Sequence, residues 1–412
     1  MSNKYIYLQR WIAPVFKSIV KKSPVTVLTG ARQVGKSTFL LNEFKNKWRY
    51  ISFDDFGILE MAKRNPVELL QTNKRLIIDE IQLEPSILKV IKQIVDADKS
   101  CRFILSGSAN LLLMSKVAES LAGRAQYMTL NPFAQGEISG NSPSAFFINL
   151  IKGKRISVPA KIKTKLQLAK KIWIGGMPEM IKTKSTDAIL RWRDGYIATY
   201  LERDLRQLSQ IENLVDFRRF MMAIAIRSGK ILNISEAARD TGLSQPTASR
   251  YMNILEISGF ATRINAFKTN RGSRIIKAPK IVWLDTGIAS HLAGFFSPDS
   301  LINSREWGGM IESFVFQHLK ILCDLIAPKT SLYYWRTRSG KEVDLVIEQG
   351  RDLIAIEIKA SKNVGYYDIH GIAAFEKEFP NMKFGIIIYT GDDFVKLTEK
   401  IFAVPLKELL CL

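Results

Sequence analysis

Cysteine and long apolar runs are scarce in this chain of 412 residues. The three cysteines, Cys101, Cys323 and Cys411, lie far apart and lack the spacing of metal ligands. We therefore expect no structural disulfide and a reducing, cytoplasmic location. No stretch approaches the roughly 18 uninterrupted apolar residues of a membrane-spanning helix. Residues 1–22 also lack the apolar core and small-residue cleavage site of a secretion signal.

Acidic side chains are in short supply as well. Lys and Arg number 60 against 39 for Asp and Glu, so the net charge is +21 and the pI is near 9.8. Such an excess attracts a polyanion through phosphate contacts and counterion release, and we expect nucleic acid, duplex DNA in particular, as the partner. A proteome that is basic throughout would give the same excess. No membrane partner is expected, because no basic amphipathic helix stands outside a domain pattern.

A strand, a glycine loop and a helix follow one another near the N-terminus. Val25–Thr29 is a short β-rich run, Gly30–Ser37 matches G-x-x-x-x-G-K-S at every fixed position, and Ser37–Phe44 has a helical pattern. In such a loop the amides wrap phosphates, Lys36 reaches the β- and γ-phosphates, and the Ser37 hydroxyl ligates Mg²⁺. The sequence therefore predicts a site for ATP and Mg²⁺. The other residues expected to bind ATP belong to the same loop and helix start: Gly30, Ala31, Arg32, Gln33, Val34, Gly35 and Thr38.

Two acids end the predicted strand Arg75–Glu80. We expect Asp79 to hold the Mg²⁺, directly or through water, and Glu80 to polarise the attacking water as a general base. A pair of acids at a strand end is often only a solvated turn. The glycine loop nearby favours the functional interpretation.

Two further elements bring candidate groups to the nucleotide. Arg102–Ser108 is a strand with a polar end, where Ser106 or Ser108 could sense the γ-phosphate, because ligands of parallel sheets lie beyond the carboxyl ends of the strands. Ser108 could equally cap the next helix. Arg124 is a candidate arginine finger, acting within its own chain or on a neighbour in a homo-oligomer. A surface arginine after a C-capping glycine is the alternative.

These motifs resemble those of AAA+-type P-loop ATPases of bacteria and archaea, in particular a group with a C-terminal domain of unknown function. The resemblance continues through Gly175–Glu179 (Gly-Gly-Met-Pro-Glu) and Tyr200–Asp204, and so spans most of the chain. It implies an ATPase core whose parallel sheet has the strand order 5-1-4-3-2. No chemistry follows from the Gly-Gly-Met-Pro-Glu signature itself. The motifs that carry the resemblance in the N-terminal third are Gly30–Ser37, Ile77–Gln82, Ser106–Asn110 and Leu121–Arg124.

The ATPase core is expected over residues 1–140, followed by a helical lid and linker over 141–214. A stretch rich in Ser, Pro and Lys marks the boundary from about residue 141, and residues 186–209 have apolar and aromatic side chains at helical spacing. Arg203 and Arg206 could reach the nucleotide, although a solvated helix face is the favoured interpretation.

Residues 215–278 have the pattern of a winged helix-turn-helix. A short helix from near Ser235, a glycine turn, a second helix over Gln245–Ile257 capped by Ser244, and then a strand follow in the order of that fold. Winged helices bind DNA or act as spacers. The expected contacts are Gln245, Thr247, Ser249 and Arg250 in the major groove, and Lys268, Arg271 and Arg274 of the wing on phosphates.

Residues 279–412 are expected to form an α/β domain like a restriction endonuclease. A helix that carries Glu312 precedes three strands, and Asp344, Glu357 and Lys359 lie on the second and third. This pattern resembles the PD-(D/E)XK nucleases, although Val343 stands where the motif has proline. The resemblance implies that Glu312, Asp344 and Glu357 hold Mg²⁺ and that Lys359 positions or deprotonates water. A hairpin with exposed charges, or a nuclease fold that only holds DNA, are the alternatives.

The working hypothesis from the sequence is an α/β ATPase that acts on DNA, with metal-dependent nuclease activity in its last domain. One alternative is an ATP-switched DNA-binding regulator without cleavage. The other is an ATPase scaffold that binds protein partners.

Overall fold

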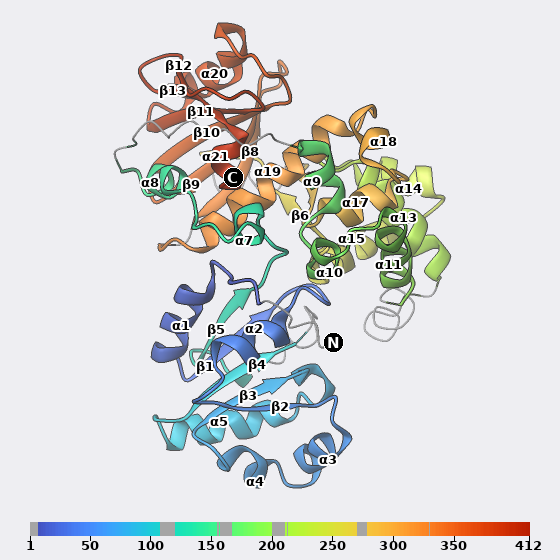
Figure 1. Ribbon diagram of the computed structural model, residues 1–412, viewed down its shortest axis with the longest axis vertical. Coiled ribbons are helices and arrows are strands. Elements are labelled where there is room, and N and C mark those ends of the chain that lie inside the picture. The colour runs from blue at the N-terminus through green and yellow to red at the C-terminus, as the bar shows by residue number, and fades with distance from the viewer. Residues whose placement is uncertain are drawn as a thin grey trace. The chain divides into compact units, whose positions relative to one another are not determined.

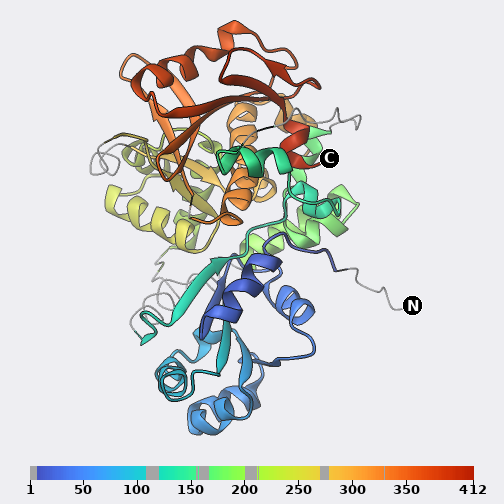
Figure 2. The same cartoon turned by 90° about the vertical axis from the view of Figure 1, so that its left-hand side faces the viewer.

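The computed structural model describes residues 7–107, 120–154, 156, 167–199, 211, 213–269, 278–328 and 330–412. These residues form two compact units (Figures 1 and 2). The first holds the described residues up to Pro132 together with Ile257–Phe260, and the second holds the remainder. None of the helices in the described part of the chain combines the length and apolar character that crossing a bilayer requires.

The first unit is built on a five-stranded sheet in which every pair of neighbouring strands is parallel. Its order is β2-β3-β4-β1-β5, which confirms the order 5-1-4-3-2 implied by the resemblance. Strand β1, which lies between β4 and β5, is buried along its whole length because both faces of a parallel sheet are covered. The strands are β1 (Val25–Thr29), β2 (Arg49–Ser52), β3 (Arg75–Asp79), β4 (Arg102–Ser106) and β5 (Ala125–Thr129).

Helices connect these strands and bury apolar stripes against the sheet. On α5 the buried side chains recur every three or four residues, at Ile87, Leu88, Ile91, Ile94 and Val95, and they join the core with strand residues such as Val27 and Leu105. The helices of this unit are α1 (Ala13–Lys22), α2 (Lys36–Glu43), α3 (Phe56–Arg64), α4 (Pro66–Gln71) and α5 (Ile87–Ala97).

The second unit begins with a series of helices. The predicted lid helix is seen as α11 up to Thr199, and Arg203 and Arg206 lie outside the described residues. The helices before the C-terminal sheet are α7 (Gln135–Ile138), α8 (Ala145–Ile151), α9 (Leu168–Ile174), α10 (Pro178–Lys182), α11 (Thr186–Thr199), α13 (Leu214–Ile226), α14 (Ile234–Thr241), α15 (Gln245–Ile257), α17 (Thr286–Leu292), α18 (Pro298–Ile302) and α19 (Trp307–Asp324).

The predicted pair of short helices is present as α14 and α15. Helix α14 begins at Ile234, one residue before the start expected near Ser235. Asn233 caps it by accepting from the Glu236 amide at 3.2 Å. The Ser244 hydroxyl accepts from the Thr247 amide at 3.3 Å, as expected of the cap of α15. An antiparallel pair of strands follows, β6 (Ala261–Ile264) with β7 (Lys280–Trp283).

A six-stranded mixed sheet ends the chain, in the order β12-β13-β11-β10-β9-β8. The predicted three-stranded meander is its antiparallel half, and β10, β11 and β13 form its parallel half. Helix α20 contacts β9 and β10 and adds Ile372 and Phe375 to the core of this sheet. The elements are β8 (Ser331–Arg336), β9 (Glu342–Gln349), β10 (Asp352–Lys359), α20 (His370–Glu378), β11 (Met382–Tyr389), β12 (Val395–Lys396), β13 (Ile401–Pro405) and α21 (Leu406–Leu410).

The Gly-Gly-Met-Pro-Glu signature has a structural function in the second unit. Its first glycine, Gly175, follows α9 with φ +76°, and a Cβ there would lie 2.6 Å from the Asp285 carboxylate. The Gly176 amide donates to Asp285 Oδ2 at 2.7 Å, and the Ile288 amide donates to Oδ1 at 2.8 Å. Burial raises the pKa of Asp285, and these amides oppose that shift. The two glycines therefore hold a buried carboxylate that also caps α17.

We predict that Gly175→Ala lowers the free energy of unfolding by about 2 to 4 kcal/mol, because it adds a steric clash to an unfavourable backbone conformation. Gly140→Ala is the matched control, since Gly140 has φ +71° but nothing within 4 Å of an added Cβ. Urea unfolding of both variants measures the difference. Equal destabilisation of the two variants would show that the contact with Asp285 contributes nothing.

Candidate functional site

The loop between β1 and α2 depends on two glycines. Gly30 has φ +151°, and a Cβ there would lie 2.5 Å from the Leu130 carbonyl oxygen. Gly35 has φ +99° and precedes the first residue of α2. Only glycine adopts these conformations without strain, so the backbone can curl around a concavity at the amino end of a helix.

The side chains of the loop divide into buried and exposed sets. Val34 is fully buried and Ala31 nearly so, whereas Arg32 and Gln33 at the tip of the loop and Thr38 on α2 are exposed. Gln33 has φ +57° and so joins the glycines in the left-handed region. Their predicted contacts with ATP would come mainly from backbone amides.

Lys36 is buried, and its ammonium donates to the carbonyl oxygens of Gly30 at 3.1 Å and Ala31 at 3.0 Å. Burial lowers the pKa of Lys36, and the nearby carboxylates of Glu80 and Asp79 oppose that shift. The ammonium is therefore held inside the loop by neutral oxygens. Phosphate oxygens are stronger partners for an ammonium than carbonyls, which suits this residue to a triphosphate.

Asp79 is bound by a residue that the sequence did not indicate. The hydroxyl of Tyr50, on β2, donates to Asp79 Oδ2 at 2.6 Å, and the Ser37 side chain lies near the same hydroxyl. The other Asp79 oxygen accepts from the Glu80 amide at 3.0 Å. Burial, followed by the hydrogen bond to Asp79, raises the pKa of Tyr50. The two predicted magnesium ligands thus both lie near one hydroxyl group.

These residues fit ATP and Mg²⁺. The cradle at Gly30 is one that a side chain would fill, and Ser37 with Asp79 offers the oxygen ligands that Mg²⁺ prefers. Ser37 and Asp79 would hold the Mg²⁺, whose charge would offset the negative charge that develops during hydrolysis. The roles of Ser37 and Asp79 as metal ligands stay predictions.

Glu80 follows the last residue of β3 in a strained conformation, with φ +53° and ψ +40°. Strained backbone of this kind occurs often at functional sites. The Gln82 amide group donates to Glu80 Oε2, and burial raises the pKa of Glu80. A carboxylate with a raised pKa is a better proton acceptor, which suits the predicted general base.

Ser106 ends β4 next to the strand that leads into the glycine loop. It pairs with Leu28 of β1, is fully buried, and its hydroxyl has no hydrogen-bond partner among the described residues. A buried hydroxyl of this kind is available to a ligand. The other candidate for sensing the γ-phosphate, Ser108, lies outside the described residues.

Arg124 lies at the amino ends of the strands, whereas the glycine loop lies at their carboxyl ends. It precedes β5, and its carbonyl accepts from the Val25 amide at the amino end of β1, whereas the glycine loop follows the carboxyl end of β1. Its guanidinium forms two hydrogen bonds with Asp96, at 2.6 and 2.8 Å. The length of β1, about 15 Å, therefore separates Arg124 from the loop of its own chain. A role on a neighbouring chain stays a prediction.

A second group of charged residues lies beside the C-terminal sheet. Asp344 on β9 accepts from the Ile358 amide at 2.8 Å, between Glu357 and Lys359 of β10. Lys359 donates to Glu357 at 3.1 Å. The structure thus brings Asp344, Glu357 and Lys359 together as expected from the alternation of side chains along a strand.

Lys280, which the sequence pattern did not indicate, lies at the centre of this group. Its ammonium is 2.7 Å from Glu312, 3.2 Å from Glu342 and 3.4 Å from Asp344, and its side chain is only 3% exposed. Burial alone would lower the pKa of Lys280, but these carboxylates outweigh it and raise the pKa. The three carboxylates therefore favour the charged form of the Lys280 side chain. We name Lys280 with Glu312, Glu342 and Asp344 the carboxylate cluster.

The fit of Mg²⁺ to the carboxylate cluster is poor. A divalent cation needs the oxygens that the Lys280 ammonium already contacts. No three acidic, His or Cys side chains in the described ranges are grouped so as to hold a metal ion. Burial, and then the charge of Asp344, raise the pKa values of Glu312 and Glu357. Two of the three predicted metal ligands, Glu312 and Asp344, are thus bound by a lysine of the same chain.

Three family models match the chain. Residues 22–139 match an AAA domain, residues 165–299 a domain of unknown function (DUF8612), and residues 307–409 another domain of unknown function (DUF4143). The second match covers part of the predicted lid, the whole of the predicted winged helix and the first residues of the predicted nuclease-like domain. The match over residues 22–139 contains the glycine loop, Asp79, Glu80 and Ser106.

Longer similarities extend over most of the chain. Uncharacterized protein Rv2008c of Mycobacterium tuberculosis and uncharacterized protein Mb2031c of Mycobacterium bovis are each 28% identical over 407 residues, 98% of this chain and 84% of theirs. A solved Walker-type ATPase of Pyrococcus abyssi, PABY2304, is 14% identical with a TM-score of 0.45, covering 70% of this chain and 97% of that one. The site geometry and the AAA domain match together make the protein a P-loop ATPase.

We predict that two substitutions separate binding from hydrolysis. Lys36→Ala should abolish nucleotide binding, whereas Glu80→Gln should keep binding and lower the rate of hydrolysis roughly 10²- to 10⁴-fold, the usual contribution of a general base. Titration with a fluorescent nucleotide and a phosphate-release assay measure the two quantities. The exposed Lys63 on α3 provides the control Lys63→Ala. ATP binding by Lys36→Ala at the unchanged affinity would remove the site assignment.

Proposed function

We propose that this protein is an ATP-switched DNA-binding ATPase, whose second unit binds duplex DNA and whose C-terminal domain holds DNA without cutting it. The position of the Lys280 ammonium in the carboxylate cluster favours DNA binding over DNA cleavage by this domain. ATP binding and hydrolysis at the glycine loop would alter the affinity for DNA.

Electrostatics supports DNA as the partner. The chain has an excess of 21 positive charges, and residues 213–269 alone carry eight basic and four acidic side chains. A basic surface attracts the phosphates of a nucleic acid independently of its base sequence. The charge therefore argues for binding rather than for recognition of particular bases.

The order of elements from α13 to β7 supports a winged helix-turn-helix as the DNA-reading part. Three helices and an antiparallel strand pair follow in the order of that fold. On α15, Gln245 is exposed and Ser249 half-exposed, while Ala248 and Tyr251 are buried on the opposite face. The exposed face agrees with the predicted major-groove contacts. Lys268, after β6, is exposed, and the predicted wing residues Arg271 and Arg274 lie outside the described residues.

The balance of charge in the carboxylate cluster supports holding over cutting. Buried carboxylates without a counter-charge are strongly destabilising, so metal-dependent nucleases rely on the metal to neutralise them. Here Lys280 supplies part of that positive charge, at hydrogen-bond distance from Glu312. The cluster therefore repels a phosphate backbone less than three unpaired carboxylates would when no metal is bound.

We predict that Gln245→Glu combined with Lys268→Glu weakens duplex binding roughly ten-fold or more, because it places negative charge against phosphates. The matched control is Gln167→Glu with Lys362→Glu, which makes the same charge changes at exposed positions outside residues 213–269. Gel shifts at several salt concentrations measure both. Equal effects of the two double variants would contradict the assignment of α15, and no binding at low salt would favour a scaffold that binds protein partners.

We predict that the wild-type protein does not cut plasmid DNA with Mg²⁺ or Mn²⁺. Lys280→Met should lower the free energy of unfolding by roughly 3 to 5 kcal/mol, because it leaves buried carboxylates uncompensated. Mn²⁺ should then raise the melting temperature of the variant more than that of the wild type. Plasmid cleavage by the wild type that is abolished in Asp344→Ala with Lys359→Ala would overturn holding in favour of a nuclease.

A further inference from the structure

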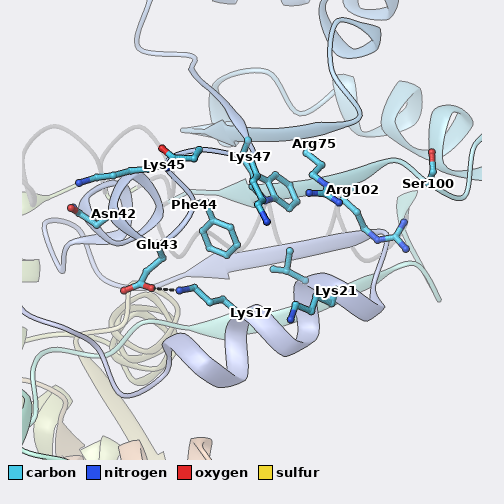
Figure 3. Close-up of a pocket in the computed structure, with 13 residues that line it drawn as sticks. Lys17, Lys21, Asn42, Glu43, Phe44, Lys45, Lys47, Arg75, Ser100 and Arg102 are labelled. Carbon is cyan, nitrogen blue, oxygen red and sulfur yellow. Dashed lines mark ion pairs between the residues drawn. The ribbon is translucent and has the colours of Figure 1, made fainter.

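A pocket of about 900 Å³ lies at the amino edge of the ATPase sheet (Figure 3). Six basic side chains line it, from α1, from the segment after α2, and from the first residues of β3 and β4. We call this space the amino-edge pocket. Its basic residues are Lys17, Lys21, Lys45, Lys47, Arg75 and Arg102.

The positive charge of this pocket is largely uncompensated. Its acidic lining residue, Glu43, forms an ion pair with Lys17 at 2.6 Å (Figure 3). Glu43 also accepts a hydrogen bond from the Tyr7 hydroxyl at 2.8 Å. Lys45, Lys47 and Arg75 are exposed and form no ion pair within the described ranges. Cations gathered around a concavity attract a ligand with several negative charges.

The amino-edge pocket is separate from the ATP site although the same elements contribute to both. Helix α2 begins with Lys36 of the glycine loop and ends with Glu43. Strand β3 begins with Arg75 and ends with Asp79, and β4 begins with Arg102. Because the strands are parallel, their amino ends share the edge opposite the nucleotide. A five-residue strand keeps the two sites about 15 Å apart.

Aromatic side chains accompany the cations. Phe44 and Trp48 both line the pocket, with their rings edge to face at a centroid distance of 5.6 Å. Phe44 is buried, whereas Trp48 is half-buried and so presents part of its indole to the pocket. Basic side chains beside an accessible aromatic ring are the combination by which proteins bind single-stranded nucleic acid, with phosphates on the cations and a base on the ring.

We infer that the amino-edge pocket binds a segment of single-stranded nucleic acid. Phosphates lie on Lys45, Lys47 and Arg75, and one base stacks on Trp48. The ATPase unit thus has its own nucleic-acid site in addition to α15. The inference rests on the proposed function for the nature of the polyanion. An acidic peptide would satisfy the cations but would leave the indole without a stacking partner.

The test is a triple variant of the full-length protein, Lys45→Gln, Lys47→Gln and Arg75→Gln. Its matched control replaces three exposed lysines of α3 and α5 in the same unit, Lys63→Gln, Lys89→Gln and Lys92→Gln. Binding of a fluorescent 12-nucleotide single strand is measured between low and moderate salt. Log affinity falls with log salt, and removal of three phosphate-binding cations should make this negative slope shallower by about 2. We expect affinity to fall roughly ten-fold in the pocket variant and much less in the control.

Several outcomes would overturn the inference. Equal weakening in both triple variants would show that only overall charge matters. Displacement of the 12-mer by inorganic tripolyphosphate at equal charge concentration would indicate a small-anion site, and displacement by poly-glutamate a site for acidic protein. Unchanged ATP affinity in the pocket variant excludes damage to the nucleotide site. Duplex binding that depends on Gln245 and Lys268 while single strands are not bound would leave the proposed function standing without this pocket.

Discussion

The parallel alignment of the five strands in the ATPase sheet governs the chemistry of the first unit. Because all strands run in one direction, every carboxyl end lies on one edge, where Lys36, Asp79, Glu80 and Ser106 meet. The same alignment gathers the strand beginnings on the other edge, where basic side chains accumulate. The parallel hydrogen-bonding pattern thus places a site for triphosphate and a pocket lined mainly by basic side chains at opposite ends of the same strands.

A different constraint, the neutralisation of buried charge, acts in the second unit. Lys280 is held by three carboxylates, and Asp285, which follows β7 in the chain, by backbone amides. Neither group could be buried alone, because an isolated charge in a protein interior is strongly unfavourable. Each fixes the elements that neutralise it. The glycines of the signature are then explained by packing, without any chemistry of their own.

Local patterns in the sequence were enough to predict much of the fold. The glycine loop, the strand that ends at Asp79 and the meander that carries Asp344 and Glu357 each depend on neighbours within a few residues. The strand order, which the structure confirms, was implied by the resemblance to AAA+-type ATPases and not by local patterns. What the sequence did not reveal are contacts between distant residues: Tyr50 with Asp79, and Lys280 with Glu312. The position of Arg124 could not be predicted either, because it depends on how β5 pairs with β1.

The hydrogen bond between Gly176 and Asp285 brings the two ends of a stretch of more than a hundred residues to one point. The entropy of closing a loop grows only slowly with its length, so the interior of a tied segment tolerates insertions and deletions better than its base does. Exposed positions on the helices between these two residues, α15 included, can therefore change without disturbing the anchor. The Asp285 carboxylate and the glycines around it are the part of this segment that tolerates change least.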